Sequence, residues 1–225
     1  MRAGKGSAAE ESPLGRDVSV PAGPVRLTAR LALPAAPRGL VAVTMDTGGP
    51  TVAAALRHAG LGTVRLDLLT VREAGDRHNL FDVPLLARRL GAACRWLGGE
   101  TGLPLGCAGG GTAAAAALEA AAADDAIRAV VCFDGRPELA RPAALARVRV
   151  PVLFVVGEFD TRLLGRTRLA AHWMPGPYEI AELPGAPHAV TGGRNADVAA
   201  ELARDWFTGH LDWFTGHLGG PGATR

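Results

Sequence analysis

Several features that would assign a chain to a specialised class are scarce or missing in this sequence. Its 225 residues include three cysteines, Cys94, Cys107 and Cys132, an odd number without the CxxC spacing of zinc or redox sites. A disulfide scaffold is therefore not expected, and reduced thiols indicate a cytoplasmic protein. The sequence contains no apolar run long enough for a signal peptide or a membrane span, and residues 1–15 are typical of a disordered tail.

An excess of one charge is also missing. The chain has 24 lysines and arginines against 22 acidic residues, a net charge of +2, and both signs are spread along its length. We therefore expect neither nucleic acid nor a membrane as a partner. The Gly-x-x-x-x-Gly-Lys-Thr loop of nucleotide-binding proteins is absent, and only His210 and His217, which are seven residues apart because of a repeat, recur at a regular spacing. The sequence thus predicts no cofactor and no metal.

Hydrophobic residues, in contrast, make up 48% of the chain, enough for the two-faced core of one α/β domain. We place this domain at residues 16–218, with a second disordered tail at 219–225. Apolar runs predict strands at residues 17–20, 25–33, 40–44, 62–67, 126–133, 151–157 and 178–183, and one more before a glycine cluster. Helical spacing predicts helices at residues 52–59, 113–123, 162–173 and 197–218, a long one starting near Asp82 and Pro84, and a short excursion at 138–147. This alternation predicts a doubly wound, mostly parallel sheet of about eight strands.

The glycine cluster marks a sharp connection between a strand and a helix. The strand leads into Gly109-Gly110-Gly111-Thr112-Ala113, and a nearly continuous run of alanines follows to Ala123. Only a crowded, sharp turn needs this many glycines at such a place. The sequence therefore predicts an elbow whose apex lies at the edge of the sheet and carries no side chain.

Further stretches resemble the dienelactone-hydrolase-like branch of the α/β hydrolases. They are Phe81-Asp82-Val83-Pro84-Leu85-Leu86, Leu103-Pro104-Leu105-Gly106, Gly135-Arg136-Pro137-Glu138-Leu139-Ala140, Val150-Pro151-Val152-Leu153 and Pro184-Gly185-Ala186-Pro187-His188. Similar family members carry Gly-Ala-Ser-Thr-Gly at the elbow, which aligns the family's nucleophile with Gly111. The resemblance, which covers residues 16–218, implies an α/β-hydrolase fold with Asp160 and His188 as the acid and the base of a triad.

The chain departs from the family a second time, in the loop after residues 40–44. The family has a His-Gly-rich loop that supplies an oxyanion-hole amide, whereas this chain has Met45-Asp46-Thr47-Gly48. A carboxylate at Asp46 would oppose a developing oxyanion, so hydrolysis is disfavoured twice. Asp46 would otherwise be an N-cap or a turn residue ahead of the helix that follows. The residues that we expect around a bound substrate are Met45, Thr47, Gly110, Thr112 and Asp134.

Cys107 is an alternative nucleophile. Cys107-Ala108-Gly109-Gly110 resembles the Cys-x-Gly-Gly elbow of dienelactone hydrolases themselves. This register would end the strand at Leu105 and place three glycines in the first helical turn, at up to ~1 kcal/mol each. In the preferred register Cys107 is buried within the strand. An engineered glycine at position 111 is a third reading, but Ala113 and the altered loop at Asp46 favour a natural departure.

Three functions follow from these readings. The first is a non-hydrolytic proton-transfer catalyst for cyclisation, elimination or isomerisation of a small apolar substrate, as in specialised metabolism, using Asp160, His188 and an Asp46 whose pKa is raised by burial. The second is a non-catalytic binder of a small ligand or a partner. The third is a hydrolase that uses Cys107.

A duplicated segment bears on the partner reading. Residues 205–211 recur as 212–218, which repeats the aromatic pair Trp206 and Phe207 as Trp213 and Phe214. This segment either adds a contact surface, for instance for a homodimer, or closes the core.

Overall fold

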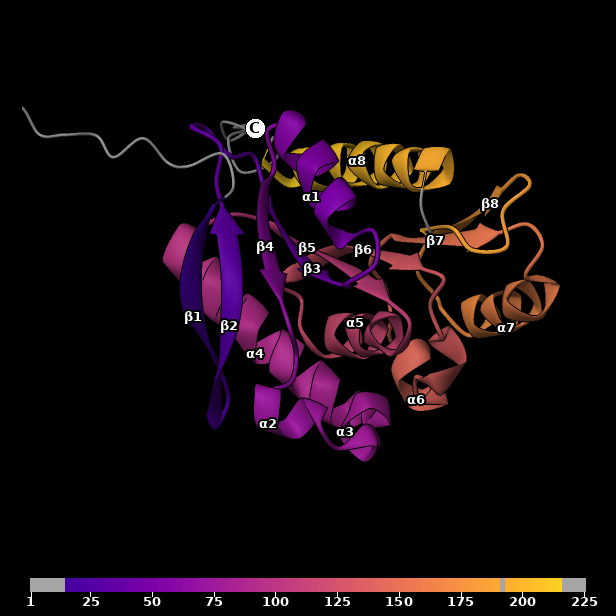
Figure 1. Cartoon of the computed structure of the whole chain (residues 1–225), viewed down its shortest axis with the longest axis horizontal. Helices are drawn as coiled ribbons and strands as arrows, with labels where there is room; N and C mark the ends of the chain where they lie inside the picture. The colour runs from indigo at the N-terminus through magenta and orange to yellow at the C-terminus, as the bar shows by residue number, and fades with distance from the viewer. Residues whose placement is uncertain (1–14, 191–192, 216–225) are drawn as a thin grey trace, which may run out of the picture.

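An eight-stranded sheet forms the centre of the computed structural model, which describes residues 15–190 and 193–215. Its strands lie in the order β1-β2-β4-β3-β5-β6-β7-β8 (Figure 1). They are β1 (Arg16–Ala22), β2 (Val25–Ala32), β3 (Leu40–Thr44), β4 (Gly62–Leu66), β5 (Leu105–Gly110), β6 (Ile127–Phe133), β7 (Val152–Gly157) and β8 (Tyr178–Leu183). Only the β1–β2 and β2–β4 pairs are antiparallel in the described sheet. The predicted doubly wound, mostly parallel sheet is confirmed.

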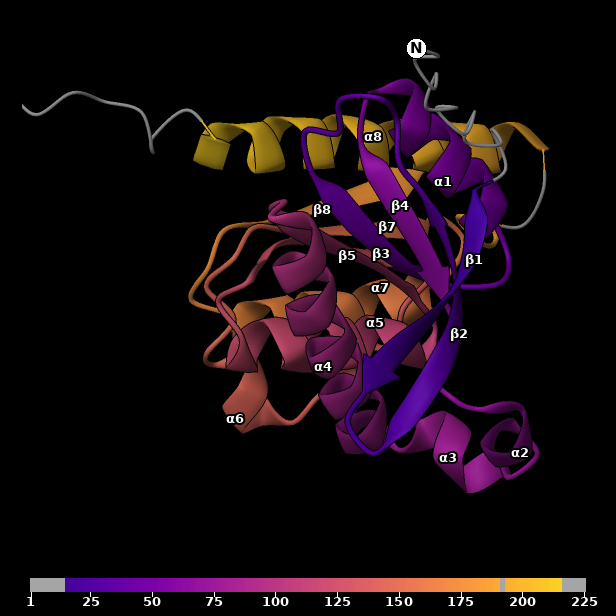
Figure 2. The same cartoon turned by 90° about the vertical axis from the view of Figure 1, so that its left-hand side faces the viewer.

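Helices cover both faces of this sheet. They are α1 (Gly49–His58), α2 (Val71–Ala74), α3 (Arg77–Phe81), α4 (Val83–Thr101), α5 (Thr112–Ala123), the 3-10 helix η1 (Pro137–Leu139), α6 (Pro142–Leu145), α7 (Thr161–His172) and α8 (Gly193–Thr215). In both views α1 and α8 lie on one side, and α4 and α5 lie on the other (Figures 1 and 2). Each layer has its own buried apolar cluster, so the sheet is a core element on both faces.

The predicted elements agree with the structure where the pattern was strong. β3 and β8 have the predicted bounds, and the Asp82 carboxylate accepts a 2.9 Å hydrogen bond from the Leu85 N–H at the start of α4. The predicted excursion at 138–147 divides into η1 and α6. Helices α2 and α3 were not predicted, because the sequence between Asp67 and Leu80 has the polar composition of a loop. Each is one short turn that begins at a local cap, Thr70 for α2 and Asp76 for α3.

The alanine-rich helix α5 fixes the centre of the fold. Its small side chains are buried, and a Cβ added to Gly135 would lie 2.4 Å from the Ala114 Cβ, so the loop after β6 passes directly over this helix. Glu119, 3% exposed, accepts three hydrogen bonds from the Arg141 guanidinium and one from its backbone N–H. This pair joins α5 to the start of α6 and thereby holds the loop after β6 in place.

Helix α8 contains the first copy of the duplicated segment. Phe207 is completely buried, and a Cβ on Gly106 of β5 would lie 2.5 Å from its ring. The first copy therefore closes the core, as one of the two readings predicted. The side chains of Trp213 and Phe214 lie outside the described residues, as do the tail predicted at 219–225 and all but the last residue of the tail predicted at 1–15. Among the described helices none is long and apolar enough to cross a membrane.

Candidate active site at the β5–α5 elbow

Gly111 lies at the apex of the turn between β5 and α5. Its φ of +52° and ψ of −126° are in a region that favours glycine. A Cβ built on Gly111 would have no neighbour within 4 Å, whereas a Cβ on Gly109 would lie 2.7 Å from the Ala113 carbonyl oxygen. The crowding that requires glycine in this turn is therefore at Gly109. The apex itself is open.

Cys107 lies inside the sheet. It is fully buried in β5, and its Sγ is 3.6 Å from the Sγ of Cys94 on α4. The contact with Cys94 and the burial both raise the pKa of the Cys107 thiol well above its usual range. Because β5 continues to Gly110, the register that ends this strand at Leu105 is wrong. A buried thiol with a raised pKa is a poor nucleophile, so the geometry opposes the Cys107 alternative.

A cavity of about 690 Å³ opens above the elbow, where β3, β4, β5 and β6 end. The carboxyl edge of a parallel sheet is the usual place for a ligand in this class of fold. Seven predicted site residues line the cavity: Met45, Asp46, Thr47, Gly110, Gly111, Thr112 and Asp134. The structure therefore brings together the elbow, the loop after β3 and the loop after β6.

The segment containing α2 and α3 forms a second wall of this cavity that the sequence did not reveal. Leu69, Val71, Ala74 and Leu80 line the cavity from this segment, and Asp67 does so from the end of β4. These apolar residues lie in a stretch without helical or strand periodicity. Their presence in a loop of otherwise polar residues was the available signal.

Asp46 lies at the rim of the cavity, not in its interior. Its side chain is exposed, so the expected burial of this carboxylate is not found. The expectation that it caps the following helix is wrong: the N-cap of α1 is Gly48, which has a φ of +74° and makes no side-chain capping hydrogen bond. Asp46 is therefore available to solvent and to a ligand at the rim.

Asp134 is the most unusual residue of the cavity. It directly follows β6 and is the one non-glycine residue in the described ranges with a positive φ, +40°. Its Oδ2 accepts hydrogen bonds from the backbone N–H groups of Ala189 (2.5 Å) and Val190 (3.3 Å), while its Oδ1 is buried without a partner among the described residues. Burial raises the pKa of Asp134, although these N–H groups and the nearby His188 lower it in part.

Asp160 and His188 do not meet. The Asp160 carboxylate accepts a 2.9 Å hydrogen bond from the Leu163 N–H and caps α7, and His188 is exposed in the loop after β8. Within the part of the chain that the structure describes, no hydrogen bond or ion pair joins these two residues, and neither lines the cavity. Asp134, not Asp160, is the carboxylate that accepts hydrogen bonds from the loop containing His188, through the N–H groups of Ala189 and Val190.

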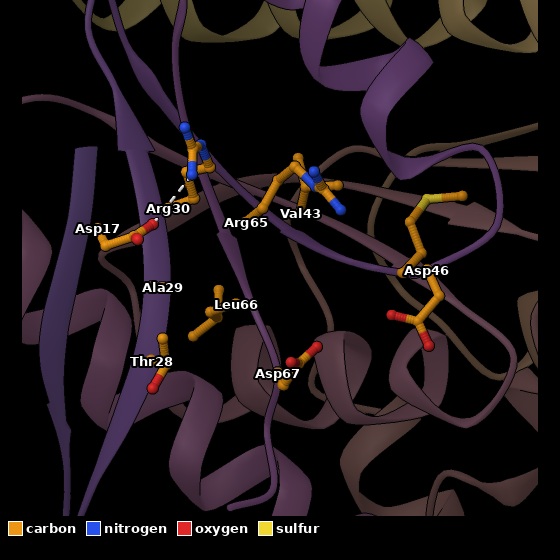
Figure 3. A pocket seen from close by; sticks show the side chains of 10 residues that line it. Asp17, Thr28, Ala29, Arg30, Val43, Asp46, Arg65, Leu66 and Asp67 are labelled. Carbon is orange, nitrogen blue, oxygen red and sulfur yellow. Dashed lines mark hydrogen bonds and ion pairs between the residues drawn. The ribbon is translucent and has the colours of Figure 1, made fainter. Parts of the chain in front are cut away.

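A smaller cavity of about 220 Å³ adjoins the first and shares Met45, Asp46, Leu66 and Asp67 with it. Figure 3 shows Arg30 and Arg65 in one half of this cavity, and Asp46 and Asp67 in the other. No group of three or more His, Cys, Asp or Glu side chains suited to a metal ion occurs among residues 15–190 and 193–215.

The chain is similar in sequence to curated proteins and similar in fold to solved structures. No protein-family model matches it. It is 38% identical over 222 residues to putative phosphoribosyl transferases of two Mycobacterium tuberculosis strains; the match covers 93% of this chain but only 50% of theirs, so the chain spans about half the length of these curated relatives.

Among solved structures, a dienelactone hydrolase from Anabaena variabilis superposes with a TM-score of 0.83 and 34% identity, covering 88% of this chain and 99% of that one. A dienelactone hydrolase-like promiscuous phosphotriesterase from metagenomic libraries shares the fold, with a TM-score of 0.69 and 17% identity over 87% of this chain and 98% of its own. The chain belongs to the dienelactone-hydrolase-like family of α/β hydrolases.

Proposed function

We propose that this protein has lost hydrolysis by an elbow nucleophile and transfers protons on a small, largely apolar organic molecule. The observation that carries the proposal is Gly111, which stands at the strained apex without a side chain and with open space where one would be. Covalent hydrolysis needs a nucleophilic atom at this point, and a glycine supplies none. The cavity above it remains, and its walls are mostly apolar.

Asp134 is the proton-transfer group in this proposal. Its Oδ2 accepts hydrogen bonds from two backbone N–H groups, and its Oδ1 is buried without a hydrogen-bond partner among the described residues. Because Asp134 lines the cavity, a small rotation of its side chain would bring the carboxylate to a bound molecule. Burial raises the pKa of this carboxyl group toward the range in which it can both take and return a proton. In an isomerisation, the carboxylate would remove a proton from one carbon of the substrate and return it to another.

The name of the mycobacterial relatives suggests another activity, phosphoribosyl transfer, which the cavity does not favour. The charged side chains that line it are the carboxylates of Asp46, Asp67 and Asp134, and no lysine or arginine lines it. Three like charges would repel a phosphorylated ribose. We therefore do not assign that activity to this cavity.

Ligand binding without catalysis is the second candidate. It is favoured by the separation of Asp160 from His188, which leaves the expected acid–base pair unassembled. In this case the cavity would hold the same kind of apolar molecule, and Asp134 would accept a hydrogen bond from it or donate one to it.

An ester-hydrolysis assay tests the loss of the nucleophile. The rate of hydrolysis of a small activated ester is compared for the natural chain, Gly111→Ser and Gly99→Ser. Gly99 lies near the end of α4 with no neighbour within 4 Å of an added Cβ, so it is a matched control. We expect no enzymatic hydrolysis by the natural chain or the control, and acylation of the serine in Gly111→Ser. Turnover by the natural chain that disappears in Cys107→Ala would refute the proposal.

Isomerisation of α-angelica lactone to its conjugated isomer separates catalysis from binding, because the reaction only moves a proton. We expect the natural chain and Asp160→Asn to accelerate it and Asp134→Asn to lose at least about tenfold in rate. Circular dichroism spectra and melting curves establish that each variant is folded. Lactone binding without acceleration in the natural chain would favour the binder instead.

A further inference from the structure

A third cavity lies in the angle between β2, β4 and α1 and shares Arg30 and Arg65, but none of the carboxylates, with the cavity of about 220 Å³ described above. It has a volume of about 120 Å³ and is lined by Arg30, Ala32, Pro50, Ala53, Arg57, Thr63 and Arg65. Three of these side chains are guanidinium groups and none is a carboxylate. We call this cavity the arginine groove. Its lining is therefore strongly cationic in a chain whose charges are otherwise mixed.

The register of the sheet forces two of these arginines together. Arg30 of β2 pairs directly with Arg65 of β4, so both side chains leave the same face of the sheet from opposite positions. Figure 3 shows the two side chains on neighbouring strands, with Arg30 beside Asp17 and Arg65 beside Val43. Like charges at directly opposed positions destabilise a strand pair, and here Arg57 from the last turn of α1 adds a third positive charge.

The described protein compensates this charge only in part. Asp17 of β1 pairs with Arg30 at 3.2 Å, and its side chain is 73% exposed. Arg57 and Arg65 form no hydrogen bond or ion pair with any residue in the described ranges, and the Arg65 Nε is buried without a partner. Burial and the charge of Arg65 together lower the pKa of Arg57. A buried guanidinium N–H that lacks an acceptor leaves part of its desolvation cost uncompensated.

We propose that the arginine groove binds a phosphate group. A phosphate dianion offers several acceptor oxygens, which suit the fork-shaped donors of Arg57 and Arg65 and would supply the acceptor that Arg65 Nε lacks. Its two negative charges would offset the positive charges of Arg57 and Arg65, which have no acidic partner among the described residues. The site is distinct from the elbow cavity, so it does not depend on the function proposed there.

Titration with inorganic phosphate, followed by calorimetry and by thermal unfolding at constant ionic strength, tests this site. We expect saturable binding by the natural chain and at least about tenfold weaker binding in R65Q and in R57Q. R26Q is the matched control because it removes the same charge as the two test variants. Arg26 lies on β2, as Arg30 does, but it contacts Ser19 outside the groove. We expect R26Q to bind within twofold of the natural chain.

A measurement without phosphate guards against a variant that simply misfolds. If like charges strain the groove, R65Q and R57Q should melt at the same temperature as the natural chain or higher in phosphate-free buffer. Glucose 6-phosphate in a parallel titration separates a site for organic monoesters from one that admits only the free ion. Absence of saturable binding, or equal losses in R26Q and R65Q, would overturn the proposal.

Discussion

Replacing Gly111 by alanine should measure the backbone strain that a side chain at the apex of the elbow would introduce. Because a Cβ at this position has no neighbour within 4 Å, the substitution adds no steric clash, and its cost comes from the backbone alone. A non-glycine residue at a φ of +52° and ψ of −126° is strained by about 1–3 kcal/mol. For a chain of this size that loss lowers the melting temperature by roughly 2–12 °C.

Two further glycine variants make the measurement specific. Gly109→Ala brings a Cβ to within 2.7 Å of the Ala113 backbone, so the turn must move and the loss of stability should exceed that of Gly111→Ala. Gly99→Ala adds a methyl group to helix α4 without any contact and should stabilise by about 0.5–1 kcal/mol. Urea unfolding followed by circular dichroism gives all three values. Equal losses for Gly111→Ala and Gly109→Ala, or no loss for Gly111→Ala, would refute the open, strained apex.

The remaining predictions concern the core, a thiol and an ion pair. Phe207→Ala should cost about 3–5 kcal/mol in urea unfolding, because the ring is completely buried against Gly106; a loss below 1 kcal/mol would contradict this packing. Cys107 should resist iodoacetamide in the native protein at pH 8 and react in urea, as mass spectrometry of the labelled peptide would show. Hydrogen bonds from the buried Arg89 and from Thr70 lower the pKa of Glu73 to about 2. The Glu73 carboxylate therefore stabilises the fold above about pH 4.5, and this contribution is lost as the pH falls toward 2. Glu73→Gln should flatten this part of a plot of unfolding free energy against pH.

The elbow could be predicted from sequence because its determinants are local. A Cβ at position 109 would collide with the backbone of Ala113, only four residues further along the chain, so the requirement for glycine at position 109 is visible in the local pattern. The same holds for the Asp82 cap and the buried strands β3 and β8. In each case the residues that interact are neighbours in the chain or alternate with a fixed period.

The sequence places Asp134 near the substrate, but it could not favour Asp134 over Asp160 as the acid of the proposed reaction. Asp160 lies between a strand and a helix, where a carboxylate serves equally well as a triad acid or as a helix cap, and the structure uses it as the cap of α7. Asp134 is distinguished by its hydrogen bonds to Ala189 and Val190, which are 55 and 56 residues away. A contact across that separation depends on the packing of β6 against the loop after β8, and no local pattern encodes it.

The elbow keeps its shape without a side chain at its apex because its surroundings impose that shape. On one side, Gly109 has room for nothing beyond its hydrogens against the Ala113 backbone. On the other, the Arg136 N–H donates a 2.9 Å hydrogen bond to the Gly111 carbonyl oxygen, which ties the turn to the loop that carries Asp134. Since neither restraint uses a side chain at position 111, the loss of a nucleophile there would leave the cavity intact. In the function that we propose, an acid from the neighbouring loop then becomes the reactive group of the same cavity, and Asp134, which lines this cavity, is the residue proposed for that role.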